Sequence, residues 1–414
     1  MRTTIINQRK ERDTLLAQPY LQRHTTYDLE EFLRNHNVKL ITGPRRVGKS
    51  TQALLMLKDR NFAYLNFDDN NLLAKWDEDL VMQLLDDIYP GYEYLLLDEV
   101  QNIAGWDIWV SKQYRRGVNL VITGSNANML SGEMATLLTG RYLEISMLPF
   151  SLEESFEWNN LDIHNLREED AASASLLQDT YLCQGGYPES VAQRSITRTY
   201  LFSLFDSIIL KDVVRRHKVR NVAALNDLAE YLLSNFCNPV SYNSVCSDLG
   251  LSSISTTKKF MGYLHEPYLF YYLPRYNNKL QLMKKAPQKI YVVDNGFVYA
   301  RAFNVSDNLG RLLENQVFIE LLRRGCDTTK TLFYYRSRND KETDFVVREG
   351  NHVKALLQVC YDMSSEKTLK REVDSLVECA EELKCSNLCI ITAHEERTIE
   401  RKGYVIRVVP VTQF

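Results

Sequence analysis

Nine consecutive residues near the start of the chain have the types and order of a loop that holds nucleotide phosphates. They are Gly43, Pro44, Arg45, Arg46, Val47, Gly48, Lys49, Ser50 and Thr51. In such a loop the backbone N–H groups wrap the phosphates, the lysine neutralises charge on the β- and γ-phosphates, and the hydroxyl ligates Mg²⁺. The sequence therefore predicts a nucleotide site here, with Lys49 on the phosphates and Ser50 on the metal ion.

Two adjacent carboxylates lie further along the chain, in the stretch "EYLLLDEVQN". Asp98, at the tip of an apolar strand, can hold Mg²⁺ through water, and Glu99 beside it can polarise an attacking water. A strand that merely ends in solvated acids is the alternative. The presence of a phosphate loop in the same chain favours the catalytic interpretation, with Glu99 as the base.

The elements that must position these residues are predicted to be parallel strands and a helix. The run "VKLIT", residues 38–42, is short, apolar and β-branched, as buried parallel strands are, and "STQALLMLKD", residues 50–59, has helical spacing. A strand, a glycine loop and a helix N-terminus together bind an anion. The runs "FAYLNFDDN" (62–70) and "VNLVITGSN" (118–126) are predicted as further strands.

Polar residues at the end of the last run, Thr123, Ser125 and Asn126, are suited to contact a γ-phosphate or to orient the water. A simple Gly-Ser-Asn turn is the alternative. Arg141 precedes a final strand in "LLTGRYLEISMLPF". It is predicted either to reach a nucleotide on a neighbouring subunit, as an arginine finger, or to cap its own helix.

Five ordered stretches resemble the AAA-type ATPases of bacteria and archaea that carry a C-terminal domain of unknown function, DUF4143. They are "GPRRVGKST", "LLLDEVQNIAGW", "ITGSNANML", "LTGRYLEISMLPFSLEE" and "GGYPES". The resemblance implies an AAA+-like P-loop ATPase core, a helical lid, a winged-helix module and a C-terminal αβ domain related to the PD-(D/E)XK nuclease fold. It implies ATP as the nucleotide, and these roles: Lys49 and Ser50 in Walker A, Asp98 and Glu99 in Walker B, Ser125 or Asn126 as sensor 1, Arg141 as the finger, and Tyr187 and Pro188 in the lid.

In one large class of these ATPases, an additional strand between the two nucleotide motifs sets the catalytic Glu beside the magnesium Asp. The run 62–70, which lies between the motifs in the sequence, is predicted to be that strand.

Length and composition indicate an ordinary globular protein of several domains. A chain of 414 residues is too long for one hydrophobic core. No apolar run is long enough to span a membrane, and the polar opening lacks the features of a signal peptide, so we expect a cytoplasmic protein without membrane contact. The eight cysteines have no zinc-site spacing, and the net charge of −3 argues against a protein that coats nucleic acid over its whole surface.

The middle of the chain carries a basic run and a predicted helix-turn-helix. The run comprises Lys211, Arg215, Arg216, His217, Lys218 and Arg220, which either touch phosphates or form a solvated helix face. Two amphipathic helices follow, with Gly250 in their turn, and then "YLFYYLPRY" and "KLQLM" are predicted as the two strands of a wing. The second helix presents Lys258 and Lys259. The alternatives are a reader of double-stranded DNA and a protein–protein connector.

The C-terminal part has the predicted order αβββαβ, which the resemblance assigns to the PD-(D/E)XK fold. A nuclease of that kind needs clustered oxygens for a divalent metal ion and a lysine that stabilises developing charge. The matching positions are Glu314, Asp344, Gln358 and Cys360. A neutral thiol at Cys360 cannot replace an ammonium, and Lys354 on the same strand is too far away. An inactive domain is therefore expected, with a weak nuclease as the alternative.

The predicted division of the chain is an ATPase core over residues 1–155, a lid over 156–205, a winged-helix module over 206–290 and a nuclease-like domain over 291–414. The leading functional hypothesis is an ATP-hydrolysing switch that uses ATP and Mg²⁺. Its alternatives are an ATP-gated, Mg²⁺-dependent DNA nuclease and an ATP-binding scaffold for a protein partner with little turnover. A homo-oligomer is expected if Arg141 acts on a neighbouring subunit.

Overall fold

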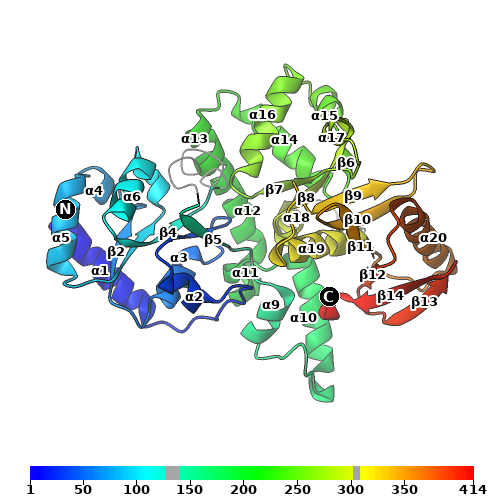
Figure 1. Ribbon diagram of the computed structural model, residues 1–414, viewed down its shortest axis with the longest axis horizontal. Coiled ribbons are helices and arrows are strands. Elements are labelled where there is room, and N and C mark those ends of the chain that lie inside the picture. Colours follow the sequence, from blue (N-terminus) through cyan, green and yellow to red (C-terminus); the bar gives the residue numbers. More distant parts are fainter. Residues whose placement is uncertain (127–139, 302–307) are drawn as a thin grey trace. The chain divides into compact units, whose positions relative to one another are not determined.

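The computed structural model describes residues 1–126, 140–301 and 308–414, and the chain divides into two compact units (Figure 1). The first unit comprises Met1–Leu148 and Glu266–Tyr268, and the second comprises Pro149–His265 and Leu269–Phe414. The finer division into four domains stays a prediction; its last boundary falls within a strand, β8 (Gln288–Val292). No helix among the described residues is long and apolar enough to cross a membrane.

The first unit is built on a parallel five-stranded sheet with the order β2-β3-β4-β1-β5. Its strands are β1 (Val38–Thr42), β2 (Phe62–Asn66), β3 (Tyr94–Asp98), β4 (Asn119–Gly124) and β5 (Tyr142–Ser146). Its helices are α1 (Arg2–Leu16), α2 (Leu29–Arg34), α3 (Lys49–Met56), α4 (Asn70–Leu73), α5 (Glu78–Ile88), the 3₁₀ turn η1 (Val100–Asn102) and α6 (Trp106–Arg115). The central strands are buried throughout, as expected when helices cover both faces of a parallel sheet. The predicted parallel α/β core is confirmed.

The strand predicted between the two nucleotide motifs in the sequence exists as β2, but in the sheet it does not lie between them. β2 lies at the edge of the sheet, beyond β3, and β4 lies between β1 and β3. Parallel strands are joined by crossover connections, which can carry the chain past neighbouring positions, so order along the sequence does not set order in the sheet. The strand β4, which contains Thr123, therefore separates the two motifs in the sheet.

The N-terminal helix α1 covers the edge of β2 that pairs with no other strand of this sheet. The Gln8 side chain donates to the carbonyl of Asn66 and accepts from its N–H, both at 3.0 Å. The guanidinium of Arg12 lies 4.8 Å from the centre of the Phe62 ring. A side-chain amide thus takes the place of a neighbouring strand, which keeps this edge from pairing with another chain.

The second unit begins with a helical region followed by a small antiparallel sheet. The helical elements are α9 (Leu152–Trp158), η2 (Glu168–Asp170), α10 (Ala171–Gln184), α11 (Pro188–Ala192), η3 (Arg194–Ile196), α12 (Thr197–Ser207), the π-helix η4 (Ile208–Val214), α13 (Arg215–His217), α14 (Val222–Ser234), α15 (Tyr242–Asp248), α16 (Ile254–His265), α17 (Leu280–Lys285) and α18 (Asn295–Arg301). The sheet has the order β6-β8-β7, from β6 (Pro239–Val240), β7 (Phe270–Leu273) and β8.

The prediction of the second strand of the wing is wrong. The stretch "KLQLM" is not the partner of β7 but lies in the helix α17, and β7 instead pairs antiparallel with β8. Leucine, glutamine, methionine and lysine all favour a helix, and no β-branched residue occurs in this stretch. The hairpin is therefore longer than predicted, with a helix in its connection.

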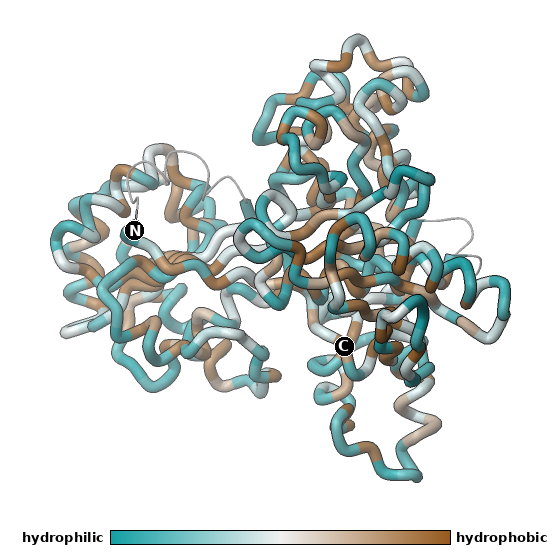
Figure 2. Tube along the Cα trace, turned by 45° about the vertical axis from the view of Figure 1, so that its right-hand side comes forward, coloured by the Kyte–Doolittle hydropathy of each residue, from teal (hydrophilic) through white to brown (hydrophobic). Residues whose placement is uncertain are grey.

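The C-terminal part has the predicted order αβββαβ, followed by a hairpin that the sequence analysis missed. Its elements are α19 (Leu309–Arg323), β9 (Leu332–Arg336), β10 (Glu342–Glu349), β11 (His352–Val359), α20 (Glu366–Leu383), β12 (Leu388–Thr392), β13 (Arg397–Arg401), β14 (Tyr404–Pro410) and the 3₁₀ turn η6 (Val411–Gln413). They form a mixed six-stranded sheet of order β13-β14-β12-β11-β10-β9. Figure 2 shows hydrophobic residues concentrated along inner segments of the chain. The apolar face of α20 packs on this sheet through Val373, Leu376 and Val377.

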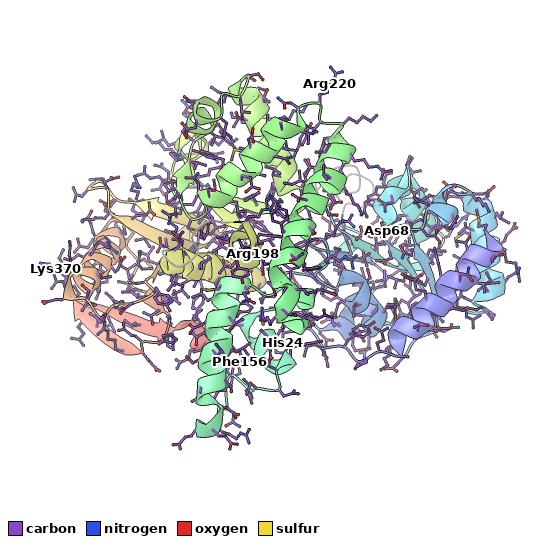
Figure 3. The ribbon with its side chains drawn as sticks, turned by 180° about the vertical axis from the view of Figure 1, so that it is seen from behind. His24, Asp68, Phe156, Arg198, Arg220 and Lys370 are labelled. Atoms are coloured by element: carbon purple, nitrogen blue, oxygen red, sulfur yellow. The ribbon has the colours of Figure 1, made fainter. Side chains whose placement is uncertain are left out.

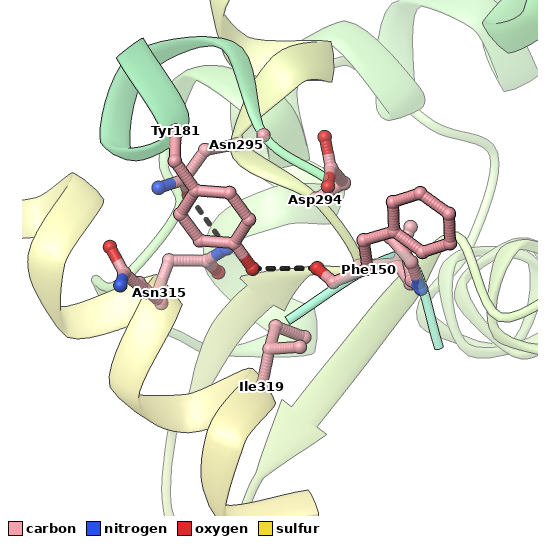
Figure 4. Close-up of a pocket in the computed structure, with 10 residues that line it drawn as sticks. Phe150, Tyr181, Asp294, Asn295, Asn315 and Ile319 are labelled. Atoms are coloured by element: carbon pink, nitrogen blue, oxygen red, sulfur yellow. Dashed lines mark hydrogen bonds between the residues drawn. The ribbon is translucent and has the colours of Figure 1, made fainter. Parts of the chain in front are cut away.

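The motif "GGYPES" is explained by close packing inside the second unit. The Asp294 carboxylate accepts hydrogen bonds from the N–H groups of Gly186 and Gly296, each at 2.8 Å. Burial raises the pKa of Asp294 to about 7, against the lowering effect of these N–H groups. Tyr181 donates to the Phe150 carbonyl at 2.8 Å beside Asp294, at a small cavity (Figure 4). The glycines are needed because the chain approaches its neighbours too closely for a side chain.

We expect Gly186→Ala to destabilise the protein by about 2 kcal/mol, because a Cβ would lie 2.2 Å from the Phe150 carbonyl oxygen. Urea denaturation monitored by circular dichroism measures the change. Gly310→Ala is the control, since a Cβ there meets no atom within 4 Å, and it should leave stability equal or raise it by up to about 1 kcal/mol. Equal midpoints for Gly186→Ala and the wild type would show that the loop yields without cost.

Candidate functional site

The phosphate-binding loop joins β1 to α3, and two glycines give it its shape. Gly43 has φ 141°, and a Cβ on it would lie 2.1 Å from the Met147 carbonyl oxygen. Gly48, at the N-cap of α3, has φ 93°. Both angles are in the region that side chains disfavour, so glycine is required at both positions. The loop thereby brings its backbone to the N-terminus of α3, where N–H groups attract anions.

Lys49 lies inside this loop. Its side chain is 4% exposed, its Nζ donates to the Pro44 carbonyl at 2.8 Å, and the same atom is 3.8 Å from a Glu99 carboxylate oxygen. The loop carbonyl and the carboxylate hold the ammonium where the phosphates are predicted to bind. Lys49 is thus positioned before any ligand arrives.

Asp98 is the last residue of β3, and its carboxylate accepts hydrogen bonds from hydroxyl groups on three other elements. Ser50 donates to its Oδ1 at 2.7 Å, Thr123 of β4 donates to the same oxygen, and Tyr64 of β2 donates to Oδ2 at 3.3 Å. Burial and the nearby Glu99 raise the pKa of Asp98 to about 6, although the Ser50 and Thr123 hydroxyls and Lys49 lower it. The Ser50 hydroxyl and this carboxylate are hard oxygen ligands in contact with each other, so the residues fit Mg²⁺.

Glu99 has a left-handed backbone, with φ 53° and ψ 43°. This conformation is strained for a residue other than glycine, and such strain gathers at functional sites. It directs the N–H of Glu99 to the Thr123 hydroxyl at 3.1 Å and its carboxylate to the hydroxyl of Ser125, also at 3.1 Å. Burial raises the pKa of Glu99, but Lys49 and the amide of Gln101 outweigh it, so the pKa lies below its ordinary value. Glu99 is therefore an ionised carboxylate at neutral pH.

The sheet explains why these residues meet. β1, β4 and β3 are adjacent and parallel, with Ile41 opposite Thr123 and Leu97 opposite Ile122. The carboxyl ends of these three strands carry the loop, Ser125 and the acid pair. All of these residues therefore lie at the same end of the sheet. Asn126, the last described residue before the gap, is half-buried and follows Ser125 directly. The roles of these residues stay predictions, but Lys49, Ser50, Asp98, Glu99 and Ser125 are brought together.

Arg141 lies at the opposite end of the same sheet, beside the amino ends of the strands. Its carbonyl accepts from the N–H of Val38 at 2.9 Å, and Val38 is paired with Tyr142, so Arg141 stands beside the start of β1. The loop leaves the far end of β1, about five residues or 17 Å away along a strand. The exposed Arg141 guanidinium lies 5.8 Å from the Tyr114 ring. This position opposes action on the nucleotide site of the same chain; the alternative role as a helix cap concerns a preceding segment, 127–139, outside the described residues.

Two residues at the site were missed by the sequence analysis. The Arg23 guanidinium donates to the carbonyl of Val47 in the loop at 2.8 Å and to that of Leu148 at 2.7 Å. Gln101 donates to the Glu99 carboxylate. Arg23 lies in the irregular segment between α1 and α2 and belongs to no motif, so only its position in space reveals the contact. Gln101 stands in the quoted acid-pair stretch, and its polar type was the one available signal.

Two of the residues predicted as a second metal site, Glu314 and Asp344, are brought together around a lysine. Glu314 of α19 and Asp344 of β10 both contact the ammonium of Lys289 from β8. Gln358 donates to Glu372 at 2.9 Å. Because an ammonium stands between the carboxylates, and Mg²⁺ needs oxygen ligands at about 2.1 Å on all sides, these residues do not fit a metal ion. Burial raises the pKa of the Cys360 thiol to about 11, which agrees with its expected neutral state.

Three family models match the chain in succession. An AAA domain matches residues 35–156, a domain of unknown function (DUF8612) matches 176–308, and another (DUF4143) matches 309–414. An uncharacterised protein of Methanocaldococcus jannaschii is 31% identical over 405 residues, which cover 92% of this chain and 89% of that protein. An uncharacterised protein of Haemophilus influenzae is 32% identical over 364 residues, covering 83% and 86% of the two chains.

Two solved structures match parts of the chain. The Walker-type ATPase of Pyrococcus abyssi is 15% identical, with a TM-score of 0.44, and the match covers 69% of this chain and 99% of that one. The RuvB Holliday junction branch migration motor of Thermotoga maritima is 14% identical, with a TM-score of 0.28, covering 57% and 84%.

We expect Asp98→Asn to stabilise the ligand-free protein at pH 7 by about 1–3 kcal/mol while it weakens binding of Mg²⁺ with a nucleotide. The pKa of Asp98 is raised from 3.8 to about 6, so the folded protein binds a proton more readily than the unfolded chain. Its charge therefore lowers stability above pH 6, and this effect disappears as the pH falls towards 3.8. Urea denaturation at several pH values measures it.

The exposed Asp59 provides the control, and Asp59→Asn should change neither stability nor nucleotide binding. If Asp98→Asn lowered stability at pH 7 as much as at pH 4, the buried charge would not be the cause.

Proposed function

The chain belongs to the family of AAA-domain proteins that carry a C-terminal DUF4143 domain, and from this premise we propose that it is an ATP-hydrolysing molecular switch. The observation that carries the proposal is the placement of Glu99. Its ionised carboxylate lies within 3.8 Å of the Lys49 ammonium and 3.1 Å of the Ser125 hydroxyl, at the mouth of the phosphate loop. A protein that only bound ATP would have no need of a strained, water-activating acid there.

Each residue of the site has a defined part in this proposal. Lys49 stabilises negative charge on the β- and γ-phosphates, and the loop N–H groups hold them in place. Bound Mg²⁺ would neutralise phosphate charge, with Ser50 and Asp98 as the residues that hold it. Glu99 accepts a proton from the attacking water, and Ser125 orients the Glu99 carboxylate. Asn126 is proposed as a second polar group near the γ-phosphate.

The switch requires that hydrolysis changes the arrangement of other parts of the chain. When the γ-phosphate leaves, its contact with Lys49 is lost, and the proposal is that the predicted lid, residues 156–205, and the parts beyond it respond. Arg141 is proposed to act on the nucleotide of a second copy of the chain. This proposal is supported by the position of Arg141 at the end of the sheet opposite the loop. A homo-oligomer would then be the active form.

We expect Glu99→Gln to lower the rate of phosphate release from ATP by about 10²- to 10⁴-fold while ATP still binds, because the variant keeps the shape of the side chain and loses its basicity. Lys49→Ala should lose ATP binding as well. Phosphate release with Mg²⁺, together with binding of a fluorescent ATP analogue, separates the two effects. Glu93→Gln, at an exposed position before β3, is the control and should leave both unchanged.

A Glu99→Gln variant that releases phosphate at the wild-type rate would contradict the proposal. Intact ATP recovered after long incubation with the wild-type protein would instead favour the scaffold.

A second proposal is that the switch acts on double-stranded DNA, and one contact in the second unit favours it. His217, which belongs to the basic run, stacks on Tyr263 of α16 with ring centres 3.6 Å apart and planes 10° apart. The basic run and the second helix of the predicted winged helix therefore lie side by side. Their exposed cations are Lys211, Arg215, Lys218, Arg220, Lys258 and Lys259.

Positive side chains predominate in these two segments, and the exposed Asp248 lies directly before the second. Within residues 208–220 and 249–265 the only carboxylate is Asp212, which is buried. Figure 3 shows Arg220 projecting into solvent just beyond the long helix that carries the run. Such a surface suits the phosphates of a duplex, which bind through counterion release rather than through base identity. A protein connector is the alternative partner.

We expect the double variant Lys258→Ala/Lys259→Ala to weaken duplex binding and to lower the slope of log affinity against log salt by about 1–2, because removing one lysine–phosphate ion pair lowers this slope by about 1. Fluorescence anisotropy of a labelled duplex at several salt concentrations measures the slope. Lys367→Ala/Lys370→Ala removes two exposed lysines of α20 and is the matched control. Equal slopes for the two double variants would exclude this surface as the DNA site and direct attention to a protein partner.

A further inference from the structure

Lys289 is a buried lysine whose ammonium meets three carboxylates at nearly equal distances. Its Nζ lies 2.9 Å from Glu314, 2.8 Å from Glu342 and 2.8 Å from Asp344, and its side chain is 2% exposed. The lysine stands on β8, Glu314 on α19, and the other two acids on β10. An ammonium has three N–H donors, so each donor has one carboxylate.

Each carboxylate also has a second partner that holds it in place. Tyr291 donates to Glu314 at 2.6 Å, Arg336 donates to Glu342 at 3.1 Å, and the Val359 N–H donates to Asp344 at 3.0 Å. Each acid is therefore held by a second partner while it contacts the same cation. Three inward-facing carboxylates from a helix and a strand are what a divalent metal ion would also require.

The charge balance shows why a cation is needed here. Burial lowers the pKa of Lys289, but the three carboxylates outweigh it and raise that pKa well above its ordinary value. Burial and the adjacent Asp344 raise the pKa of Glu314 to about 7, against the effect of Lys289. For Glu342, the ammonium overcomes burial, and its pKa is lowered. Lys289 is thus charged, and without it the acids would repel one another.

We propose that Lys289 is the resident cation of this pocket, where it takes the place of a divalent metal ion between Glu314, Glu342 and Asp344 and fastens β8 to α19 and β10. A catalytic lysine of a nuclease must reach a phosphodiester. The Lys289 side chain is only 2% exposed, and its ammonium contacts three carboxylates. The pocket is therefore a structural clasp and cuts no DNA. The lysine lies in the part predicted as a winged-helix module and the acids in the part predicted as nuclease-like, so the clasp joins the two.

The first test counts bound Mn²⁺ by electron paramagnetic resonance, without nucleotide. All proteins carry Asp98→Asn, which removes the carboxylate among the two predicted metal ligands of the ATP site. The protein with an intact Lys289 pocket should bind no Mn²⁺ there, and adding Lys289→Met should create one Mn²⁺ site per chain. Adding Asp344→Asn as well should remove that site. Lys284→Met, at an exposed position of α17, is the matched control and should create none.

The second test measures stability by thermal unfolding. Lys289→Met should lower Tm by on the order of 10 °C, because it leaves buried carboxylates without a cation, and Mn²⁺ should restore part of the loss. The triple variant Lys289→Met/Glu314→Gln/Asp344→Asn should regain at least half of the lost Tm without Mn²⁺. It also provides a folded protein if Lys289→Met alone does not fold.

Three results would overturn the proposal. The first is Mn²⁺ binding by the protein with Lys289 intact that Asp344→Asn abolishes, because the lysine would then share the pocket with a metal ion as in a working nuclease. The second is a Lys289→Met protein that folds and binds no Mn²⁺. The third is a triple variant no more stable than Lys289→Met.

Discussion

The position of β4 between β1 and β3 is the constraint on which the nucleotide site depends. Neighbouring strands lie about 4.8 Å apart, so the interposed strand separates the phosphate loop from the acid pair by about 10 Å. The side chains of Lys49 and Ser50 reach across this gap, and Ser50 meets Asp98 at 2.7 Å. β4 also supplies Thr123, whose hydroxyl contacts both Asp98 and the backbone of Glu99. With β3 directly beside β1, there would be no space for phosphates and a metal ion.

The buried carboxylates of the two units have different partners. The difference agrees with the role that is proposed for each group of acids. In the nucleotide site Asp98 faces hydroxyl groups and the next carboxylate, and its pKa is raised to about 6. In the proposed function, this carboxylate would be stabilised by a cation that binds together with the nucleotide. In the second unit the three acids around Lys289 already have their cation, supplied by the chain. An incomplete set of charges suits a site that binds and releases, and a complete one suits a permanent joint.

Close packing of backbone segments recurs at both of the glycine motifs that were visible in the sequence. Gly43 lies against the carbonyl of Met147, and Gly186 lies against that of Phe150. The first contact shapes a loop that is suited to hold a ligand, whereas the second seats a turn around the buried Asp294. Similar glycine patterns therefore serve different purposes, and only the surrounding atoms distinguish them.

The parallel sheet, the phosphate loop and the acid pair were predictable from the order of residues, because each depends on groups that are near in sequence: an apolar run, its flanking glycines, and a helix start. The αβββαβ order of the C-terminal part was predictable for the same reason. The place of β2 at the edge, the helix in place of a wing strand, and the contacts of Arg23 and Lys289 were not. They depend on which distant segments pack together, and a single residue such as Lys289 carries no local pattern that shows whether its ammonium meets water or three buried carboxylates.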